Sequence, residues 1–294
     1  MLSDMKSKRN RLYYALSVFT SVFLAVSILL FSGCKTPRPE STGTRYVVLS
    51  PEIAEIISVI EGTDNIVGIT EECNFPDTYE GKVVVGKFGT LNKERIISLR
   101  PSIVFATSLE QQAIASELAK LGIKVITVYP KTIAEMLTGI QTVGTAIGKA
   151  ERAAFVADSL RTELDNIRKK VALDYLPKVY LEIYREPLMS VSDKSFVGEL
   201  IELAGGDNIF SDLERDYSRV KAEDIIRAKP DIMICYSRDS RENISKRMGW
   251  KDIPALKDNK IYFESDINPD WLLRAGPRCV LGAKRLQEIF YNGK

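Results

Sequence analysis

Apolar runs and amphipathic stretches alternate along the chain after its first 44 residues. Runs rich in β-branched residues lie at 45–50, 124–129 and 178–183, and continuous apolar runs of this kind are typical of strands buried on both faces of a parallel sheet. Stretches with apolar residues spaced three and four apart, such as 51–60 and 132–147, predict helices between the strands. This alternation predicts an α/β protein whose ligand-binding groups gather at the carboxyl ends of the strands.

One pattern occurs twice. Residues 91–108 read LNKERIISLRPSIVFATS and residues 220–237 read VKAEDIIRAKPDIMICYS, with six of the eighteen positions identical. Each copy predicts a short helix with a carboxylate in its first turn, Glu94 or Glu223, where the helix dipole favours negative charge. A proline then stops the helix, and an apolar run predicts a buried strand. We therefore expect two similar lobes, although a chance likeness stays open because a short repeat is weak evidence of duplication.

Residues 149–173 break this rhythm. A single amphipathic helix of about 25 residues, or roughly 37 Å, is predicted here. Between two lobes it would act as a stiff spacer, unlike a Gly/Ser linker. The apolar residues that follow the helical spacing are Ala153, Val156, Leu160, Leu164, Ile167 and Val171.

The first 34 residues have the pattern of an export signal. Four basic residues are followed by an almost uncharged apolar run at 12–31 and by Ser-Gly-Cys, which ends at Cys34. This ending resembles the lipobox of bacterial lipoproteins, in which the cysteine is acylated and becomes the new N-terminus, although Phe31 replaces the usual leucine. A retained membrane helix stays open because the run is long enough to span a bilayer. Either outcome places the folded part outside the cytoplasmic membrane.

The predicted organisation follows from these segments. Residues 35–44, KTPRPESTGT, are rich in Pro, Ser, Thr and Gly and predict a flexible tether. We expect a signal peptide at 1–34, this tether at 35–44, an N-terminal α/β lobe at 45–148, a bridging helix at 149–173 and a C-terminal α/β lobe at 174–294.

Composition excludes several functions. Beyond residue 33 the chain carries 37 basic and 38 acidic side chains, and a net charge of −1 does not indicate nucleic-acid binding. The chain has no histidine, which excludes Ser-His-Asp triads, HExxH sites and His-based metal capture. Three cysteines lie beyond the signal, at Cys73, Cys235 and Cys279; they predict no disulfide framework, although a pair between Cys235 and Cys279 stays open.

Aromatic residues fall at predicted strand-to-helix junctions rather than on periodic apolar faces. They would line a cleft for a flat, partly apolar ligand, with charged neighbours supplying polar contacts. The alternative, that they only pack loops, stays open. We predict no catalytic residue, because no nucleophile with a base and no phosphate loop is visible. The candidate ligand-binding residues are Phe88, Tyr184, Tyr217, Asp270, Trp271 and Arg274.

The order of several motifs resembles a known family. The chain contains, in sequence, Ser-Pro after the first strand, GIT, CNFP, NKERIISLRPSIVFA, the long bridging helix, ELIELAGGDNIF, VKAEDIIRAKPDI and DWLLRAGPR. This series, over residues 45–291, resembles the substrate-binding proteins of ABC importers for cobalamin and ferric siderophores. DWLLRAGPR looks especially like the cobalamin-binding branch.

The resemblance carries expectations about fold, ligand and partner. It implies the class III periplasmic-binding-protein fold, in which two Rossmann-like lobes are joined by one long backbone helix. It implies that Glu94 and Glu223 dock on arginines of a permease dimer and that Asp270 and Trp271 contact the ligand. Phe88 and Tyr217 match tryptophans that flank the corrin, and Glu72 stands where a tyrosine is expected, so this chain departs from the pattern at the ligand.

The resulting hypothesis is an extracytoplasmic lipoprotein, anchored to a membrane by lipid on Cys34, that delivers cobalamin or another corrinoid to an ABC permease. We expect a monomer without a cofactor or metal of its own. A ferric siderophore or haem carrier of the same family is the alternative, and a carrier of bare zinc or manganese is disfavoured without histidine. From other classes, a metal-chelatase-like enzyme and a tethered sensor stay open.

Overall fold

The structure is a computed structural model of the 294-residue chain, and it describes residues 43–107, 111–172 and 174–291. The predicted signal peptide, with Cys34, and most of the predicted tether lie outside these residues. Within the described ranges, no helix combines the length and the apolar character needed to cross a bilayer.

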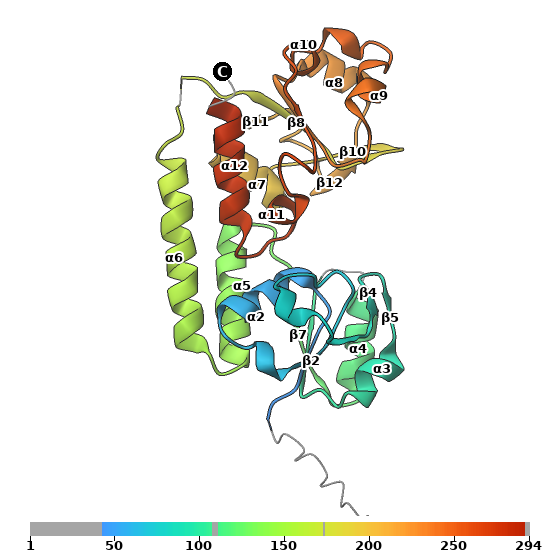
Figure 1. Ribbon diagram of the computed structural model, residues 1–294, viewed down its shortest axis with the longest axis vertical. Helices are drawn as coiled ribbons and strands as arrows, with labels where there is room; N and C mark the ends of the chain where they lie inside the picture. The colour runs from blue at the N-terminus through green and yellow to red at the C-terminus, as the bar shows by residue number, and fades with distance from the viewer. Residues whose placement is uncertain (1–42, 108–110, 173, 292–294) are drawn as a thin grey trace, which may run out of the picture. The chain divides into compact units, whose positions relative to one another are not determined.

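The first lobe is built on a five-stranded parallel sheet with the order β3-β2-β1-β6-β7. Helices α3 (Lys93–Ser98) and α4 (Gln112–Lys120) cover one face, while α2 (Pro51–Val59) and α5 (Ile133–Ala146) cover the other (Figure 1). Ser50 caps α2 and Pro51 occupies its first turn, so the chain turns directly from strand to helix. The strands are β1 (Tyr46–Val48), β2 (Ile66–Ile69), β3 (Val83–Val84), β6 (Ile103–Ala106) and β7 (Lys124–Thr127).

The second lobe repeats this plan with a four-stranded parallel sheet of order β11-β8-β13-β14. Its strands are β8 (Lys178–Glu182), β11 (Asp207–Asn208), β13 (Ile232–Cys235) and β14 (Ile261–Tyr262). One face packs on α7 (Phe196–Leu203) and α12 (Cys279–Tyr291), and the other on α8 (Ala222–Ala228), α9 (Arg241–Ser245) and α10 (Pro254–Lys257).

The doubled motif corresponds to the same structure in both lobes. Its two copies form α3 followed by β6 and α8 followed by β13, and each strand lies between two partners, next to an edge strand of its sheet. The likeness extends to the backbone, since Arg100 and Lys229 occupy the same place before the proline and both adopt positive φ, at 47° and 52°. Non-glycine residues adopt this conformation rarely, so the shared feature supports a true repeat. The predicted pair of α/β lobes is confirmed.

One long helix connects the lobes, but it is shorter than predicted. Helix α6 (Ala150–Arg168) has 19 residues and lies beside α5 and α12 (Figure 1). The predicted end at residue 173 is wrong, because after Arg168 the amides of Lys170 and Val171 bond three residues back instead of four. Val171 instead packs against the turn at Gly205.

A continuous core runs through both lobes. Buried side chains of α2 and α5, of α6, and of α7 and α12 form one hydrophobic cluster, and each lobe adds a smaller cluster on its outer face. Cys235 lies in the outer cluster of the second lobe and Cys279 in the shared core. Both are free thiols, so the pairing left open by the sequence does not occur.

A hairpin, a small sheet and a short helix were not predicted. Strands β4 (Gly86–Lys87) and β5 (Thr90–Leu91) form a hairpin in the first lobe. In the second lobe, β9 (Tyr184–Arg185), β10 (Leu188–Val191) and β12 (Tyr217–Arg219) form an antiparallel sheet, and α11 (Pro269–Leu273) precedes α12. These elements position the side chains between the lobes.

Candidate functional site

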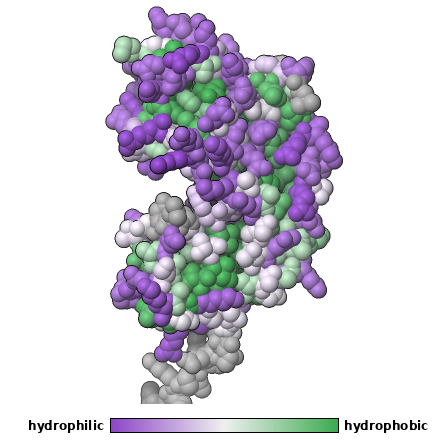
Figure 2. Space-filling model, turned by 180° about the vertical axis from the view of Figure 1, so that it is seen from behind, coloured by the Kyte–Doolittle hydropathy of each residue, from purple (hydrophilic) through white to green (hydrophobic). Residues whose placement is uncertain are grey.

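A cavity of about 230 Å³ lies between the lobes. Figure 2 shows the hollow between them, open to solvent. The cavity is lined from both lobes: by Pro51, Glu52, Phe88, Thr107, Tyr129, Pro130 and Lys131 on one side, and by Ser195, Phe196, Asp216, Tyr217, Leu273, Arg274 and Ala275 on the other. This is the location expected for a ligand site in an α/β fold.

In the first lobe, the carboxyl ends of β1, β6 and β7 lead into the cavity. Buried Gln111 ties the ends of β1 and β6 together: its carboxamide oxygen accepts from the Thr107 amide at 2.9 Å, and its amide nitrogen donates to the Leu49 carbonyl at 2.7 Å. The same nitrogen donates to the Phe88 carbonyl at 3.4 Å, and the Phe88 amide donates to both carboxylate oxygens of Glu72 at 3.0 and 3.1 Å. The position of half-buried Phe88 is therefore fixed from two sides.

In the second lobe, the first residue of β12 supplies the main aromatic surface. Tyr217 pairs with Val191 of β10, and 37% of its surface is exposed. Partial burial raises the pKa of the Tyr217 phenol to about 12, with smaller contributions from Tyr129, Asp216 and Glu52. Tyr217 is therefore neutral at physiological pH and can donate or accept a hydrogen bond.

An ion pair crosses the cavity. Lys131 Nζ lies 2.9 Å from Asp216 Oδ2 in the other lobe and 6.0 Å from the centroid of the Tyr129 ring. The hydrogen bond to Asp216 is the main reason that the pKa of Lys131 is raised. The positive charge of Lys131 is thus already partnered by the protein.

A second set of charges joins the lobes beside the cavity. Glu55 of α2 is buried, and its carboxylate accepts from Arg274 at 3.0 Å and from Arg278 at 2.6 and 2.9 Å. Asp270 pairs with Arg274 at 3.0 Å, and the guanidinium of Arg278 lies 4.2 Å from the centroid of the Phe75 ring. We call Glu55, Asp270, Arg274 and Arg278 the interlobe cluster.

The structure brings together only some of the predicted ligand residues. Phe88, Tyr217 and Arg274 line the cavity, whereas Asp270 does not line it but forms an ion pair with Arg274. Arg274 also donates to the Asn74 side chain and the Glu72 carbonyl, so both terminal nitrogens of its guanidinium have protein partners.

The other two predicted ligand residues lie off the cavity wall. Trp271 follows Asp270 on α11, is half-buried and is not among the residues that line the cavity. Tyr184 lies on β9, 55% exposed, and does not line the cavity either.

Both predicted docking glutamates are exposed. Glu94 lies in the first turn of α3 and Glu223 in the first turn of α8, and both helices lie on the side of the molecule away from α6 (Figure 1). Neither carboxylate has an ion-pair partner among the described residues. They remain available to a partner.

A second buried carboxylate, Glu182 at the end of β8, organises charges inside the second lobe. It accepts from Arg247 at 2.6 and 2.8 Å, from Ser237 at 2.5 Å and from Tyr180 at 3.2 Å. Arg247 also pairs with buried Asp239 at 2.8 Å. We call these residues the Glu182 cluster; none of them lines the cavity.

The sequence interpretation missed several residues that the structure places at the site. Thr107 lies at the end of the second half of a repeat, and Tyr129 is the last residue of the strand predicted at 124–129, so their position was a usable signal. Glu52 and Glu55 were the two carboxylates of a largely apolar helix, which indicates a polar role on an inward face. Arg278 could not have been assigned, because its partner Glu55 is 223 positions away.

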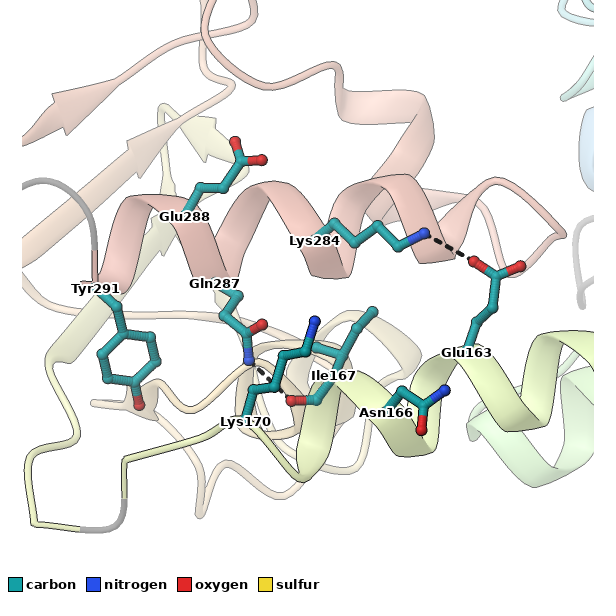
Figure 3. A pocket seen from close by; sticks show the side chains of 8 residues that line it. All are labelled: Glu163, Asn166, Ile167, Lys170, Lys284, Gln287, Glu288 and Tyr291. Atoms are coloured by element: carbon teal, nitrogen blue, oxygen red, sulfur yellow. Dashed lines mark hydrogen bonds and ion pairs between the residues drawn. The ribbon is translucent and has the colours of Figure 1, made fainter.

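A larger hollow of about 530 Å³ lies elsewhere, between α6 and α12. Figure 3 shows that its side chains come from these two helices, which are bridged by the 2.7 Å ion pair of Lys284 with Glu163 and by the 2.8 Å bond from Gln287 to the Ile167 carbonyl. The hollow lies away from the carboxyl ends of the strands, where binding groups gather in this class of fold. We therefore assign the candidate site to the interlobe cavity.

Comparisons with known proteins give related sequences over most of the chain. An ABC transporter substrate-binding lipoprotein of Bacillus subtilis, YvrC, is 28% identical over 255 residues, which cover 84% of this chain and 80% of that protein. The vitamin B12-binding protein of Yersinia pestis is 26% identical over 264 residues, covering 89% and 91%.

The fold is shared with solved structures. The periplasmic haem-binding protein RhuT from Roseiflexus superposes with a TM-score of 0.75 at 22% identity, covering 85% of this chain and 99% of that one. At this identity the likeness supports the fold alone, and it confirms the expected arrangement of two lobes joined by one helix.

The family model for periplasmic binding proteins matches residues 47–277, which include most of both lobes, the connecting helix and every residue that lines the cavity. Members of this family bind solutes outside the cytoplasm and are not enzymes. This chain belongs to the periplasmic binding protein family.

Proposed function

We propose that this chain is the lipid-anchored binding protein of an ABC importer and that it captures cobalamin or another corrinoid between its lobes. The observation that carries the proposal is the interlobe cavity, which both lobes line with aromatic side chains and whose cationic side chains are already partnered. YvrC and the vitamin B12-binding protein support the transport role by similarity.

The charges of the cavity favour a ligand without strong negative charge. The two cationic side chains on its wall, Lys131 and Arg274, are held by Asp216 and by the interlobe cluster. An anionic ligand would have to compete with these carboxylates or remain unpaired, which costs binding free energy. Haem carries two carboxylates, and many ferric siderophores are anionic, whereas the rim of a corrinoid consists of neutral amides.

The aromatic groups suit a flat ring system. Phe88 and Tyr129 of the first lobe and Tyr217 of the second line the same cavity, and aromatic faces can pack against an extended ligand. The cavity is smaller than the roughly 300–1,000 Å³ typical of small-molecule sites. A corrinoid would therefore extend from it into the open hollow between the lobes.

A ferric siderophore or haem carrier is the second candidate. It is favoured by the fold likeness to a haem-binding protein. Against it, the two carboxylates of haem would find both cationic side chains of the wall already paired with protein carboxylates.

The proposal also includes a permease partner and a lipid anchor. Glu94 and Glu223 are exposed carboxylates at equivalent positions of two similar lobes, which suits a permease made of two subunits with basic residues at the contact. Cys34 would carry the lipid; it lies outside the described residues. Stable anchoring would require two acyl chains or more, since one chain binds a membrane only weakly.

Calorimetric titration of the purified protein with cyanocobalamin, haem and an anionic ferric catecholate siderophore tests the ligand. We expect saturable one-to-one binding of cyanocobalamin and weaker binding of the other two. Preference for haem or for the siderophore would replace the corrinoid by the second candidate.

Replacement of Cys34 by alanine should abolish lipid labelling, and unchanged labelling would contradict the anchor.

A further inference from the structure

Thr107 presents a polar atom that the folded chain does not satisfy. It directly follows β6, lines the interlobe cavity and is 1% exposed. Its amide is bonded to Gln111, but its hydroxyl oxygen has no hydrogen-bond partner. Among the described residues it is the one buried side-chain oxygen or nitrogen without a partner. Because an unpaired buried hydroxyl is costly, such a group at a cavity wall points to a partner that arrives from outside.

Glu52 lines the same cavity and is also unpartnered. It lies in the first turn of α2, half-buried, and no ion pair or side-chain hydrogen bond holds its carboxylate among the described residues. The other charged side chains of the wall are partnered: Lys131 by Asp216, and Arg274 by Glu55 and Asp270. Glu52 therefore contributes the uncompensated charge of the cavity, and that charge is negative.

We infer that Thr107 and Glu52 are specificity-determining residues that bind hydrogen-bond donors on the ligand, such as primary amides, and discriminate against carboxylates. This inference rests on the proposed binding function and sharpens it. A carboxylate accepts but cannot donate, and the Thr107 hydroxyl can do either. A ligand amide would donate to Glu52 and satisfy Thr107, whereas a ligand carboxylate would meet like charge at Glu52.

The first test needs no ligand. Thr107→Val keeps the shape and removes the hydroxyl, so it should raise the melting temperature of the unliganded protein by about 2–4 °C, the scale of one relieved polar group in a chain of this size. Thr70→Val is the matched control: Thr70 is also buried, but its hydroxyl contacts the Cys73 thiol at 3.5 Å, so this change should not stabilise the protein. A lower melting temperature in Thr107→Val would show that the hydroxyl is partnered in the folded chain and would overturn the inference.

The second test uses cyanocobalamin and its mixed monocarboxylic acids, in which one amide has been hydrolysed. Thr107→Val should weaken cyanocobalamin about 3- to 10-fold, the effect of one lost hydrogen bond, and Thr107→Ser should restore most of the affinity. Glu52→Gln removes the charge and should reduce the preference for cyanocobalamin over the acids at least about 3-fold. Unchanged affinity in Thr107→Val, or an unchanged preference in Glu52→Gln, would overturn the corresponding role.

Failure of the proposed function is a separate outcome. Wild-type protein that does not bind cyanocobalamin contradicts the corrinoid proposal. The melting comparison of Thr107→Val with Thr70→Val then still decides whether the Thr107 hydroxyl is unpartnered. A specific stability gain in Thr107→Val, together with loss of cyanocobalamin affinity in the same variant, supports the inference, because a purely structural hydroxyl would change both in the same direction.

Discussion

Glu55 and Glu182 are two buried carboxylates, one in each lobe, and each forms ion pairs with arginine. Their surroundings differ. Glu182 accepts hydrogen bonds from Arg247, Ser237 and Tyr180, all in its own lobe. Both arginines that donate to Glu55 belong to the opposite lobe. The same chemistry therefore fixes the inside of one lobe in the first case and the junction of two lobes in the second.

This difference assigns separate roles to the two clusters. A buried ion pair is weak evidence for added stability, but removing one partner leaves a buried charge without compensation. Loss of Glu182 should damage folding of the second lobe without involving the cavity. Loss of Glu55 should damage both stability and binding, because Arg274 lines the cavity.

The largest effect is expected for Glu182→Ala. Arg247, Ser237 and Tyr180 would lose their shared acceptor, so the free energy of unfolding should fall by about 3–5 kcal/mol. Urea unfolding measures this change. Glu186→Ala is the control, since Glu186 is an exposed neighbour whose side chain pairs at 3.4 Å with Arg185, and its effect should stay within about 0.5 kcal/mol. A loss below about 1 kcal/mol for Glu182→Ala would contradict the role of the Glu182 cluster.

Glu55→Ala should have a smaller effect on folding and a larger one on binding. In both variants the arginines keep a second carboxylate, Asp270 for Arg274 and Arg278 and Asp239 for Arg247. Glu55→Ala strands no hydroxyl donors such as Ser237 and Tyr180, so we expect a smaller loss of about 2–3 kcal/mol in unfolding free energy. A double-mutant cycle with Arg278→Ala should give a coupling of about 1–3 kcal/mol. Ligand affinity should fall in Glu55→Ala more than in Glu182→Ala; the reverse order would contradict the comparison.

Alkaline pH provides a graded test of buried thiols in the shared core. Burial raises the pKa of Cys73 to about 11 and that of Cys279 to about 12, from an ordinary value of 9.0. Because these folded-state values are raised, the unfolded chain loses its protons first. Stability should be unaffected by these groups below pH 9 and should decline as the pH rises through 11. Urea midpoints measured from pH 7 to 11 check this, and Cys73→Ala should make the decline shallower; an equally steep decline would exclude Cys73 as a cause.

The smallest effect on folding is expected for the exposed carboxylates. Reversing both Glu94 and Glu223 to lysine should change the unfolding free energy by no more than about 0.5 kcal/mol and leave ligand affinity unchanged. Docking should be lost, because like charges would meet across the contact, and each single reversal should cause a partial, salt-sensitive loss. Permease pull-down and uptake measure this. Normal uptake by the double variant would refute the docking role.

The parts of the fold that the sequence predicted share one property. The helix and strand of each repeat lie within eighteen consecutive residues, so local spacing, the proline and the apolar run were enough to place α3 with β6 and α8 with β13. The small strands β9 and β12 have two and three residues, too few for a period to be visible. The length of α6 was overestimated because Val171 continues the apolar spacing of the helix but packs against Gly205.

The site was predicted less completely than the fold. Phe88, Tyr217 and Arg274 were found because they follow strands or stand in a motif, and all three line the cavity. Trp271 belongs to the same motif, yet short α11 places it away from the cavity wall. The interlobe cluster depends on contacts between residues more than 200 positions apart, which no local pattern contains.

The central claim is that a corrinoid binds in the interlobe cavity, and calorimetric titration of cyanocobalamin into wild-type protein, Phe88→Ala and Tyr217→Ala tests it most directly. The account predicts one site in the wild type and a loss of about 1–3 kcal/mol in each variant, as expected for a removed aromatic contact. Circular dichroism should show that both variants remain folded. Absence of binding in the wild type, or equal affinity in all three proteins, would contradict the claim.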